Sequence, residues 1–505
     1  MSIILLQCLA LGGIVVYATL ILVRPFVSPL RSIPGPFVTR FTDLWYLAKI
    51  RRGDFELTNK RLHDQYGPIV RYGPNRFSFA TLDAGKIIYG HASPFPKSSW
   101  YSAWKSPGAW TLFADQNEKR HAANRRLLQH TYSLSSLVTY EPYVDECADL
   151  VSQRLVEMAH GGINFDLRHW LQCYAFDVIG SITYSKRLGF LDRGLDVEGV
   201  MKAISNMAAY ASLAGIYSFV HPYIFPMMNY MAGSKGMGRT YVQSFTKGCI
   251  EEHQSNPKAF DSDAADDGSG KATDFLTKFY AQHTRIPDTF TTTHIMVACV
   301  QNMAAGSDTV GNSLSAIIYY LLKSPPCLQR LREELDRYQI VEKKVKFKDT
   351  QSMVYLQAVI KEALRLHPAA ALPLERVVPE GGATISGRFF PEGTIVAINP
   401  WVEHRNTALF GNDADEFRPE RWLTDDVDKL AIMNRHSMPF GSGSRTCIGR
   451  HIAMLEICKL VPRLMRDFDF ELVGKLARPQ SSWVTTNHLL LKPKDFLVNV
   501  KLRQT

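Results

Sequence analysis

The chain has 505 residues and a formal net charge of +10, and its length alone allows several domains. Its eight cysteines are scattered with no CxxC pair, which excludes a disulfide framework and a zinc site and suits a reducing compartment. The basic charge comes without a nucleic-acid motif or an aromatic–basic run, so we expect no nucleic acid partner. It fits a membrane surface and an acidic partner protein instead.

The first segment predicts a membrane anchor. Residues 2–23 carry no charge, and these 22 residues would span roughly 33 Å as a helix, enough to cross a hydrocarbon core. A cleaved signal peptide is the alternative, but the segment starts without basic residues and ends at Arg24. The arginines after it favour a cytosolic position for the rest of the chain. We predict three parts: an anchor over residues 1–24, a proline-rich hinge over residues 25–38 and one domain over residues 39–505.

The next segments alternate between short strands and helices. Residues 69–72 and 76–80 are strand-like pieces beside Gly-Pro turns, and segment 94–114 is an aromatic loop. A helix is expected to open at Glu118. His121 and Arg125 lie one turn apart on it, so both can reach the same anionic group, and a solvated arginine is the alternative.

Two apolar segments follow. Residues 203–234 carry no charged side chain, and their prolines argue against a membrane span. Residues 294–320 are long, apolar and rich in small residues, which predicts a buried central helix. Within that helix, Gly306 can loosen the hydrogen-bond ladder and the Thr309 hydroxyl can bind the freed carbonyl, opening a groove beside Asp308. A purely structural polar pair is the alternative.

An acid–base pair lies on the next predicted helix. Glu362 and Arg365 are three residues apart and therefore share one helical face, and His367-Pro368 ends the helix. Such a pair is most often a solvated surface ion pair. The apolar residues on both sides favour burial here.

The most informative run extends from Phe440 to Gly449. Cys447 lies at the end of a glycine-rich loop, just before an apolar helical stretch. The glycines allow close approach to a flat metallocofactor, and the helix N-terminus stabilises a thiolate. Arg445 is placed to pair with a carboxylate. The alternative is a glycine-rich loop with a buried cysteine.

These motifs together resemble the cytochrome P450 family. The pattern Phe440-x-x-Gly443-x-Arg445-x-Cys447-x-Gly449 is similar to its haem-binding motif. Residues 305–309, the pair Glu362/Arg365 and the stretch 417–422, which contains Arg421, resemble three further family motifs. The resemblance covers about residues 30–500 and looks most like fungal microsomal members of the pisatin demethylase group. It implies a mainly α fold with a smaller β portion and an N-terminal transmembrane helix.

The resemblance also implies roles for individual residues. Cys447 would be the metal ligand of haem b (iron protoporphyrin IX), and Asp308 and Thr309 would be catalytic in proton delivery. Segments 94–114 and 203–234 would form the pocket cover and a membrane-dipping lid; an aromatic surface loop and a buried helix pair are the alternatives. The expected haem-binding residues are His121, Arg125, Arg376, Phe440, Gly443, Arg445 and Gly449. The expected structural network is Glu362, Arg365 and Arg421.

The implied activity is a monooxygenase that inserts one oxygen atom into a lipophilic small molecule by hydroxylation, epoxidation or O-demethylation, in fungal secondary metabolism. No flavin domain is apparent, so electrons would come from NADPH–cytochrome P450 reductase, with cytochrome b5 as an additional partner. The resemblance places the enzyme in the endoplasmic reticulum membrane, single-pass, with a cytosolic catalytic domain. Alternatives are a haem-thiolate isomerase, dehydratase or ring-coupling enzyme, or a non-catalytic haem sensor. The intact Asp308-Thr309 pair favours oxygen insertion.

Overall fold

The computed structural model describes residues 19, 22–23, 26–233, 236, 238–255, 273–338 and 345–504. The predicted anchor over residues 1–24 therefore falls almost entirely outside the described residues. In the described part of the chain, no single helix is long and apolar enough to cross a membrane. One pair, Val197–Ala214 with Ser218–Met231, has the necessary length and composition but is bent by 118°.

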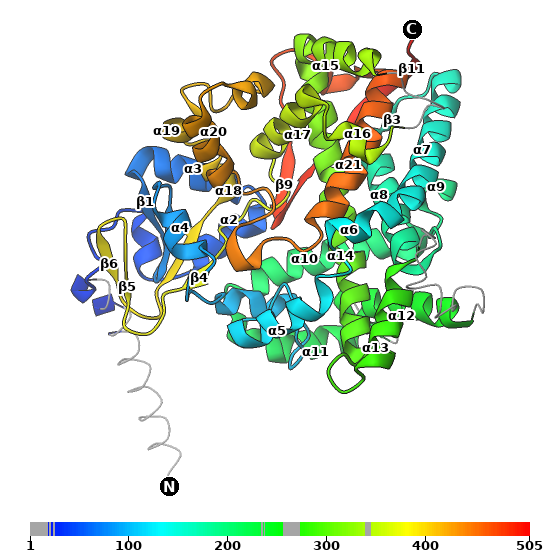
Figure 1. Ribbon diagram of the computed structural model, residues 1–505. Coiled ribbons are helices and arrows are strands. Elements are labelled where there is room, and N and C mark those ends of the chain that lie inside the picture. Colours follow the sequence, from blue (N-terminus) through cyan, green and yellow to red (C-terminus); the bar gives the residue numbers. More distant parts are fainter. Residues whose placement is uncertain are drawn as a thin grey trace.

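The molecule is mainly helical with a smaller β portion, as predicted. Figure 1 shows most of the long helices gathered on one side, and the strands β1, β4, β5 and β6, with α2 to α4, on the other. The longer helices are α3 (Phe55–Tyr66), α5 (Glu118–Leu128), α7 (Glu141–Gly161), α8 (Leu167–Tyr184), α10 (Val200–Ala214), α11 (His221–Met231), α12 (Arg239–Ser255), α13 (Phe275–Arg285), α14 (Thr292–Lys323), α15 (Pro325–Arg337), α17 (Val354–Leu366) and α21 (Arg450–Asp467). The shorter ones are α2 (Leu44–Arg52), α4 (Ala84–Tyr89), α6 (Leu134–Leu137), α9 (Phe190–Arg193), α16 (Phe347–Thr350), α18 (Pro400–Glu403), α19 (Thr407–Phe410) and α20 (Val427–His436).

Helix α14 is the predicted central helix, and it packs against α8, α12, α17 and α21. Thr291 and His294 cap its N-terminus reciprocally, which satisfies two of the amides that lack a partner in the first turn. Gly306 and Gly311 let α8 lie very close. A Cβ at either position would come within 3.0 Å of Ile179 Cγ1 or Gln172 Cα, respectively. The helix is continuous from end to end, so Gly306 serves helix packing rather than a break in the helix.

The main sheet has the strand order β1-β2-β7-β4, with β2 and β7 parallel and the other pairs antiparallel. Its first two strands match the predicted strand-like pieces. Arg376 pairs with Val396 at its edge, which fixes the position of that arginine. The strands of the four sheets are β1 (Ile69–Gly73), β2 (Arg76–Phe79), β7 (Ile395–Ile398), β4 (Arg376–Val377); β3 (Phe165–Asp166), β11 (Leu497–Leu502), β8 (Phe468–Leu472); β9 (Thr485–His488), β10 (Leu490–Pro493); β5 (Ala383–Ile385) and β6 (Arg388–Phe390).

Candidate active site

Cys447 lines a hollow inside the protein. Its amide donates to the Phe440 carbonyl at 2.9 Å, which closes the loop just before α21. The side chain is exposed, yet burial raises the pKa of the thiol, while the Gly449 amide and the charges of Arg125 and Arg450 oppose that rise. A side chain that is accessible and still surrounded by protein faces an internal space. A buried, inert cysteine is therefore not what the structure shows.

A close contact that the sequence did not reveal explains why position 443 is a glycine. Its φ is +64°, and a Cβ there would lie 1.7 Å from the Tyr89 carbonyl oxygen of α4. Gly441 also has a positive φ of +73°, but its nearest neighbour would be 3.9 Å away. The close approach seen at Gly443 is thus to the backbone of α4. At Gly449 a Cβ would be 4.0 Å from the sulfur of Cys447.

Several cations gather around this hollow. Arg445 donates to Glu118 at 2.6 Å, but its buried Nε and Nη1 have no partner within the described residues. Arg376 lines the same pocket as Arg445 and donates to main-chain carbonyls, including Glu375 O at 2.8 Å. The guanidinium groups of Arg376 and Arg445 therefore line one pocket, in which Glu118 is the single acidic residue among the described lining residues.

The structure brings His121 and Arg125 to the same region. Burial, together with the charges of Arg445, Lys97 and Arg125, lowers the pKa of His121 to about 3, so the ring is neutral at physiological pH. Burial also lowers the pKa of Arg125, an effect that a Cys447 thiolate opposes and Arg445 reinforces. Both residues are thus near the predicted ligand, and the alternative of a fully solvated arginine does not fit.

Sequence reasoning missed Lys97. It pairs with Arg376 in an isolated β-bridge and lies 4.3 Å from the ring centroids of both Tyr101 and Phe113. Burial first, and then Arg376 and Arg445, hold the pKa of its ammonium well below the ordinary value. The only signal in the sequence was a lysine inside the aromatic segment 94–114. Trp100, Tyr101 and Trp104 of that segment are buried, so it is not an aromatic surface loop.

Together these residues fit a dianionic cofactor with a soft metal. Unpaired buried N–H groups of Arg445 require an acceptor, and carboxylates match guanidinium groups bidentately. A thiolate at Cys447 is a suitable ligand for iron. The donor set is therefore right for a haem with two propionates.

On α14, Thr309 donates its hydroxyl to the Ala305 carbonyl at 2.7 Å, as the sequence predicted. Ala305 is exposed although its neighbours Met303 and Ser307 are fully buried, so the helix opens to space at this point. Asp308 faces another direction and is 1% exposed. It accepts from Gln172 and forms an ion pair with Lys492.

The structural network is assembled as predicted. Glu362 accepts from Arg365 at 2.8 and 2.9 Å, from Arg421 at 3.2 Å and from the Trp422 indole at 2.9 Å. Glu362 and Arg365 are both 0% exposed, which excludes a solvated surface pair. Arg365 also donates to the carbonyls of His404, Ala414 and Glu416.

His404 joins this network to the cysteine loop, a link that the sequence did not reveal. Its Nε2 accepts from the Met438 amide at 2.7 Å, so its Nδ1–H must donate to the Arg365 carbonyl at 2.8 Å. Burial lowers the pKa of His404 to about 3, which keeps this neutral tautomer in place.

An accessible cysteine on a loop that carries partly unpaired Arg445, joined through Met438 and His404 to a buried Glu–Arg network, is typical of a haem-thiolate site. The cytochrome P450 family model matches residues 34–500. The chain belongs to the cytochrome P450 family and is a cytochrome P450 monooxygenase, and this family implies a haem-thiolate cofactor and generally uses a reductase partner.

Three relatives of this chain come from fungi. It is 39% identical to a pisatin demethylase of Fusarium vanettenii over 450 residues, which cover 88% of this chain and 86% of that protein. It is 36% identical to a cytochrome P450 monooxygenase of Aspergillus terreus, covering 87% and 90% of the two chains. It is 35% identical to the cytochrome P450 monooxygenase cicH of Emericella nidulans, covering 94% of each.

Proposed function

We propose that this chain uses haem b to insert one atom of dioxygen into a lipophilic small molecule of fungal secondary metabolism. The carrying observation is Cys447, accessible yet surrounded by protein, close in the chain to Arg445, which lines a pocket with Arg376 and has two buried nitrogens without a partner among the described residues. The names of the relatives favour O-demethylation among the possible outcomes. In that case hydroxylation of a methoxy carbon is followed by loss of formaldehyde.

Each residue has a distinct part in this proposal. Cys447 holds the iron, and Arg125, Arg376 and Arg445, with His121 and Lys97, hold the propionates. Bound haem supplies the activation of dioxygen, which consumes two electrons and two protons and yields the hydroxylated product and water. Thr309 orients a proton donor at the Ala305 groove, and Asp308 passes protons inward from the partly exposed Lys492.

The cofactor assignment is tested by absorbance. The reduced, carbon monoxide-bound protein should show the red-shifted Soret band of a thiolate-ligated haem, and Cys447→Ala should lose it. The control Cys327→Ala changes a buried cysteine on α15 and should keep the band. A band that survives Cys447→Ala would remove Cys447 as the ligand.

Oxygen insertion is tested with Thr309→Ala, with Thr309→Ser as the control that keeps the hydroxyl. With a partner reductase and methoxy-substituted aromatic probes, the alanine variant should still consume NADPH but release more hydrogen peroxide and less formaldehyde than the parent. If Thr309→Ala and the parent formed the same amount of formaldehyde per NADPH consumed, the role of Thr309 would be contradicted. Product formed without dioxygen would favour an isomerase or dehydratase instead.

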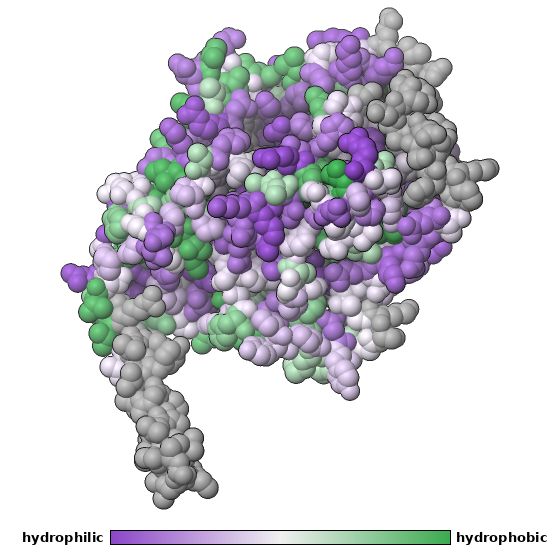
Figure 2. Space-filling model, turned by 60° about the horizontal axis from the view of Figure 1, so that its bottom comes forward, coloured by the Kyte–Doolittle hydropathy of each residue, from purple (hydrophilic) through white to green (hydrophobic). Residues whose placement is uncertain are grey.

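We infer that residues 1–24 anchor the enzyme in the endoplasmic reticulum membrane, with the domain after the hinge in the cytosol. The uncharged segment supports this. Exposed apolar residues from segments 37–44 and 219–231 support it as well, and these segments are joined nearby by a hydrogen bond of 3.4 Å between the hydroxyls of Thr42 and Tyr217. Figure 2 shows green apolar patches along the lower edge of the molecule. The exposed residues are Phe37, Val38, Leu44, Phe219, Tyr223, Met227, Tyr230 and Met231.

N-terminal sequencing of protein extracted from membranes with detergent tests the anchor. The chain should begin at or near residue 1 and resist alkaline carbonate extraction. A mature start near residue 25, or a soluble full-length protein, would overturn the proposal.

NADPH–cytochrome P450 reductase, with cytochrome b5 as a second donor, is the proposed electron source. The exposed cations Lys119, Arg126, Arg435 and Arg450 suit an acidic partner. Electron transfer should slow as ionic strength rises, and a rate independent of salt would argue against charge-guided docking.

A further inference from the structure

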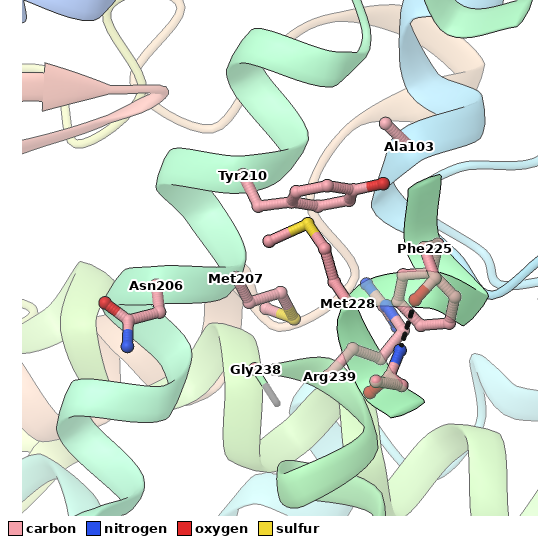
Figure 3. Close-up of a pocket in the computed structure, with 9 residues that line it drawn as sticks. Ala103, Asn206, Met207, Tyr210, Phe225, Met228, Gly238 and Arg239 are labelled. Atoms are coloured by element: carbon pink, nitrogen blue, oxygen red, sulfur yellow. Dashed lines mark hydrogen bonds between the residues drawn. The ribbon is translucent and has the colours of Figure 1, made fainter. Parts of the chain in front are cut away.

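A separate pocket lies among the lid helices, which are α10, α11 and the start of α12. The 3₁₀ helix η2 (Ser99–Trp104) covers one side of it. Its cavity volume is about 20 Å³, room for a small group such as a carboxylate, and the pocket opens to solvent beyond it. The side chains drawn in Figure 3 converge on it from these elements. The main lining residues are Ala103, Met207, Tyr210, Phe225, Met228 and Arg239.

Helix α11 separates this pocket from an exposed apolar surface. Phe225 and Met228 are three residues apart, half-buried, and line the pocket. Tyr223 and Met227 on the other face are 79% and 56% exposed. An apolar molecule lying on the outer face of α11 is therefore one helix away from the pocket.

Arg239 is a buried cation without a counterion. It is 8% exposed, and the one recorded hydrogen bond of its five-donor guanidinium goes from Nη2 to the Trp104 carbonyl. It forms no ion pair with any residue in the described ranges, and residues 199–250 contain no Asp or Glu. Burial alone lowers its pKa, to about 10, so it remains charged at neutral pH. Buried charges are normally paired.

The neighbouring polar groups do not supply the missing anion. His221 donates from Nε2 to the Lys105 carbonyl at 2.9 Å, and its Nδ1 accepts from the Tyr210 hydroxyl at 2.8 Å. Burial lowers the pKa of His221, and the charge of Arg239 lowers it further. Both nitrogens are occupied and the ring is neutral. Among the described lining residues, Arg239 alone carries a charge.

We propose that this pocket is a binding site for the carboxylate of a lipophilic carboxylic acid. The planar fork of Arg239 matches a carboxylate, and the methionines and Phe225 can adapt to the adjoining carbon skeleton. One cation balances one carboxylate, and the small cavity disfavours a phospholipid headgroup, so the carbon skeleton of the acid would lie where the pocket opens to solvent. The inference goes beyond the proposed monooxygenase function and does not depend on turnover.

The test uses full-length, haem-loaded protein in nonionic detergent, with decanoate and methyl decanoate as matched probes. Decanoate should bind about tenfold or more tightly than its ester, by calorimetry and by the rise in Tm, because only the acid makes charge-assisted hydrogen bonds. Arg239→Gln should abolish that preference, and Arg239→Lys should keep part of it. Lys247→Gln removes an exposed charge from the same helix and should behave as the parent.

Folding is controlled within the same experiment. Glutamine at 239 can still donate to Trp104, and it removes a desolvated charge, so the unliganded variant should be at least as stable as the parent. Equal binding of acid and ester by the parent, or a preference that survives Arg239→Gln, would overturn the site. A parallel measurement with 4-phenylbutanoate and its methyl ester distinguishes two possible sources of the carboxylic acid. Tighter binding of decanoate indicates a membrane fatty acid, and tighter binding of the aryl acid indicates a substrate-like acid. Because no turnover is measured, failure here leaves the monooxygenase proposal standing.

Discussion

Two buried arginines contrast the network around Glu362 with the pocket beside α11. Arg365 donates to both carboxylate oxygens of Glu362 and to three main-chain carbonyls. Within the part of the chain that the structure describes, Arg239 makes one hydrogen bond and no ion pair. Where the chain holds its own backbone in place, it supplies every partner itself. By contrast, two buried nitrogens of Arg445 and the charge of Arg239 have no partner among the residues that the structure describes.

The largest effect should come from breaking the buried network around Glu362. Glu362→Ala leaves Arg365 and Arg421 buried without their anion, which should cost about 3–5 kcal/mol of unfolding free energy. The protein should be recovered largely haem-free or aggregated. Glu333→Ala, on the exposed face of α15, should stay within about 0.5 kcal/mol of the parent. A stable, haem-replete Glu362→Ala protein that is merely slow would contradict the structural role.

A smaller effect should follow from adding a side chain at Gly443. Gly443→Ala and Gly441→Ala both place alanine at a positive φ, but only the first meets the Tyr89 carbonyl. The difference between them should be about 1–3 kcal/mol, the usual cost of overpacking. Denaturant unfolding of the two holoproteins measures it. Equal stabilities would show that α4 shifts freely.

His404→Gln should cost about 1 kcal/mol at pH 7.5, because one of the two hydrogen bonds that link Arg365 to Met438 is lost or weakened. It should also change the acid response. Since the folded-state pKa of His404 is about 3 and the unfolded value 6.5, the parent loses stability as pH falls between those values, by about 1.4 kcal/mol per unit for this group. The variant should lose less over that window. Tm scans from pH 7.5 to 4.5 measure this, with exposed His91→Gln as the control; identical slopes in His404→Gln and the parent would refute the assignment.

The smallest effect on folding is expected on the outer face of α11. The double variant Tyr223→Ser, Met227→Ser should change the unfolding free energy by no more than about 0.5 kcal/mol per site, because both side chains are largely exposed. It should nevertheless weaken binding to phosphatidylcholine vesicles when the anchor is removed. Unchanged vesicle binding would mean that this face does not contact lipid.

Local spacing predicted much of this molecule. The three-residue separation of Glu362 and Arg365 predicted their ion pair, and the long apolar segment predicted helix α14. The hydrogen bond from the Thr309 hydroxyl to the Ala305 carbonyl, one turn earlier in that helix, was also expected. These features depend on residues close in sequence, so helix geometry alone determines them.

The features that sequence reasoning missed depend on contacts between distant segments. His404 reaches Met438, Lys97 meets Arg376, and Asp308 pairs with Lys492 only after folding. The lack of acids around Arg239 is visible in the sequence. Its burial is not, because packing of η2, α10 and α11 creates it.

The contact between Gly443 and Tyr89 also has a consequence for the order of folding. It joins a loop near the C-terminal end of the domain to a helix near its beginning, and contacts between such distant segments pay a high loop-closure entropy before they form. The shape of the cysteine loop is therefore settled late, after both ends of the domain have come together. Haem capture should accordingly report completed folding of the whole domain rather than of any fragment of it.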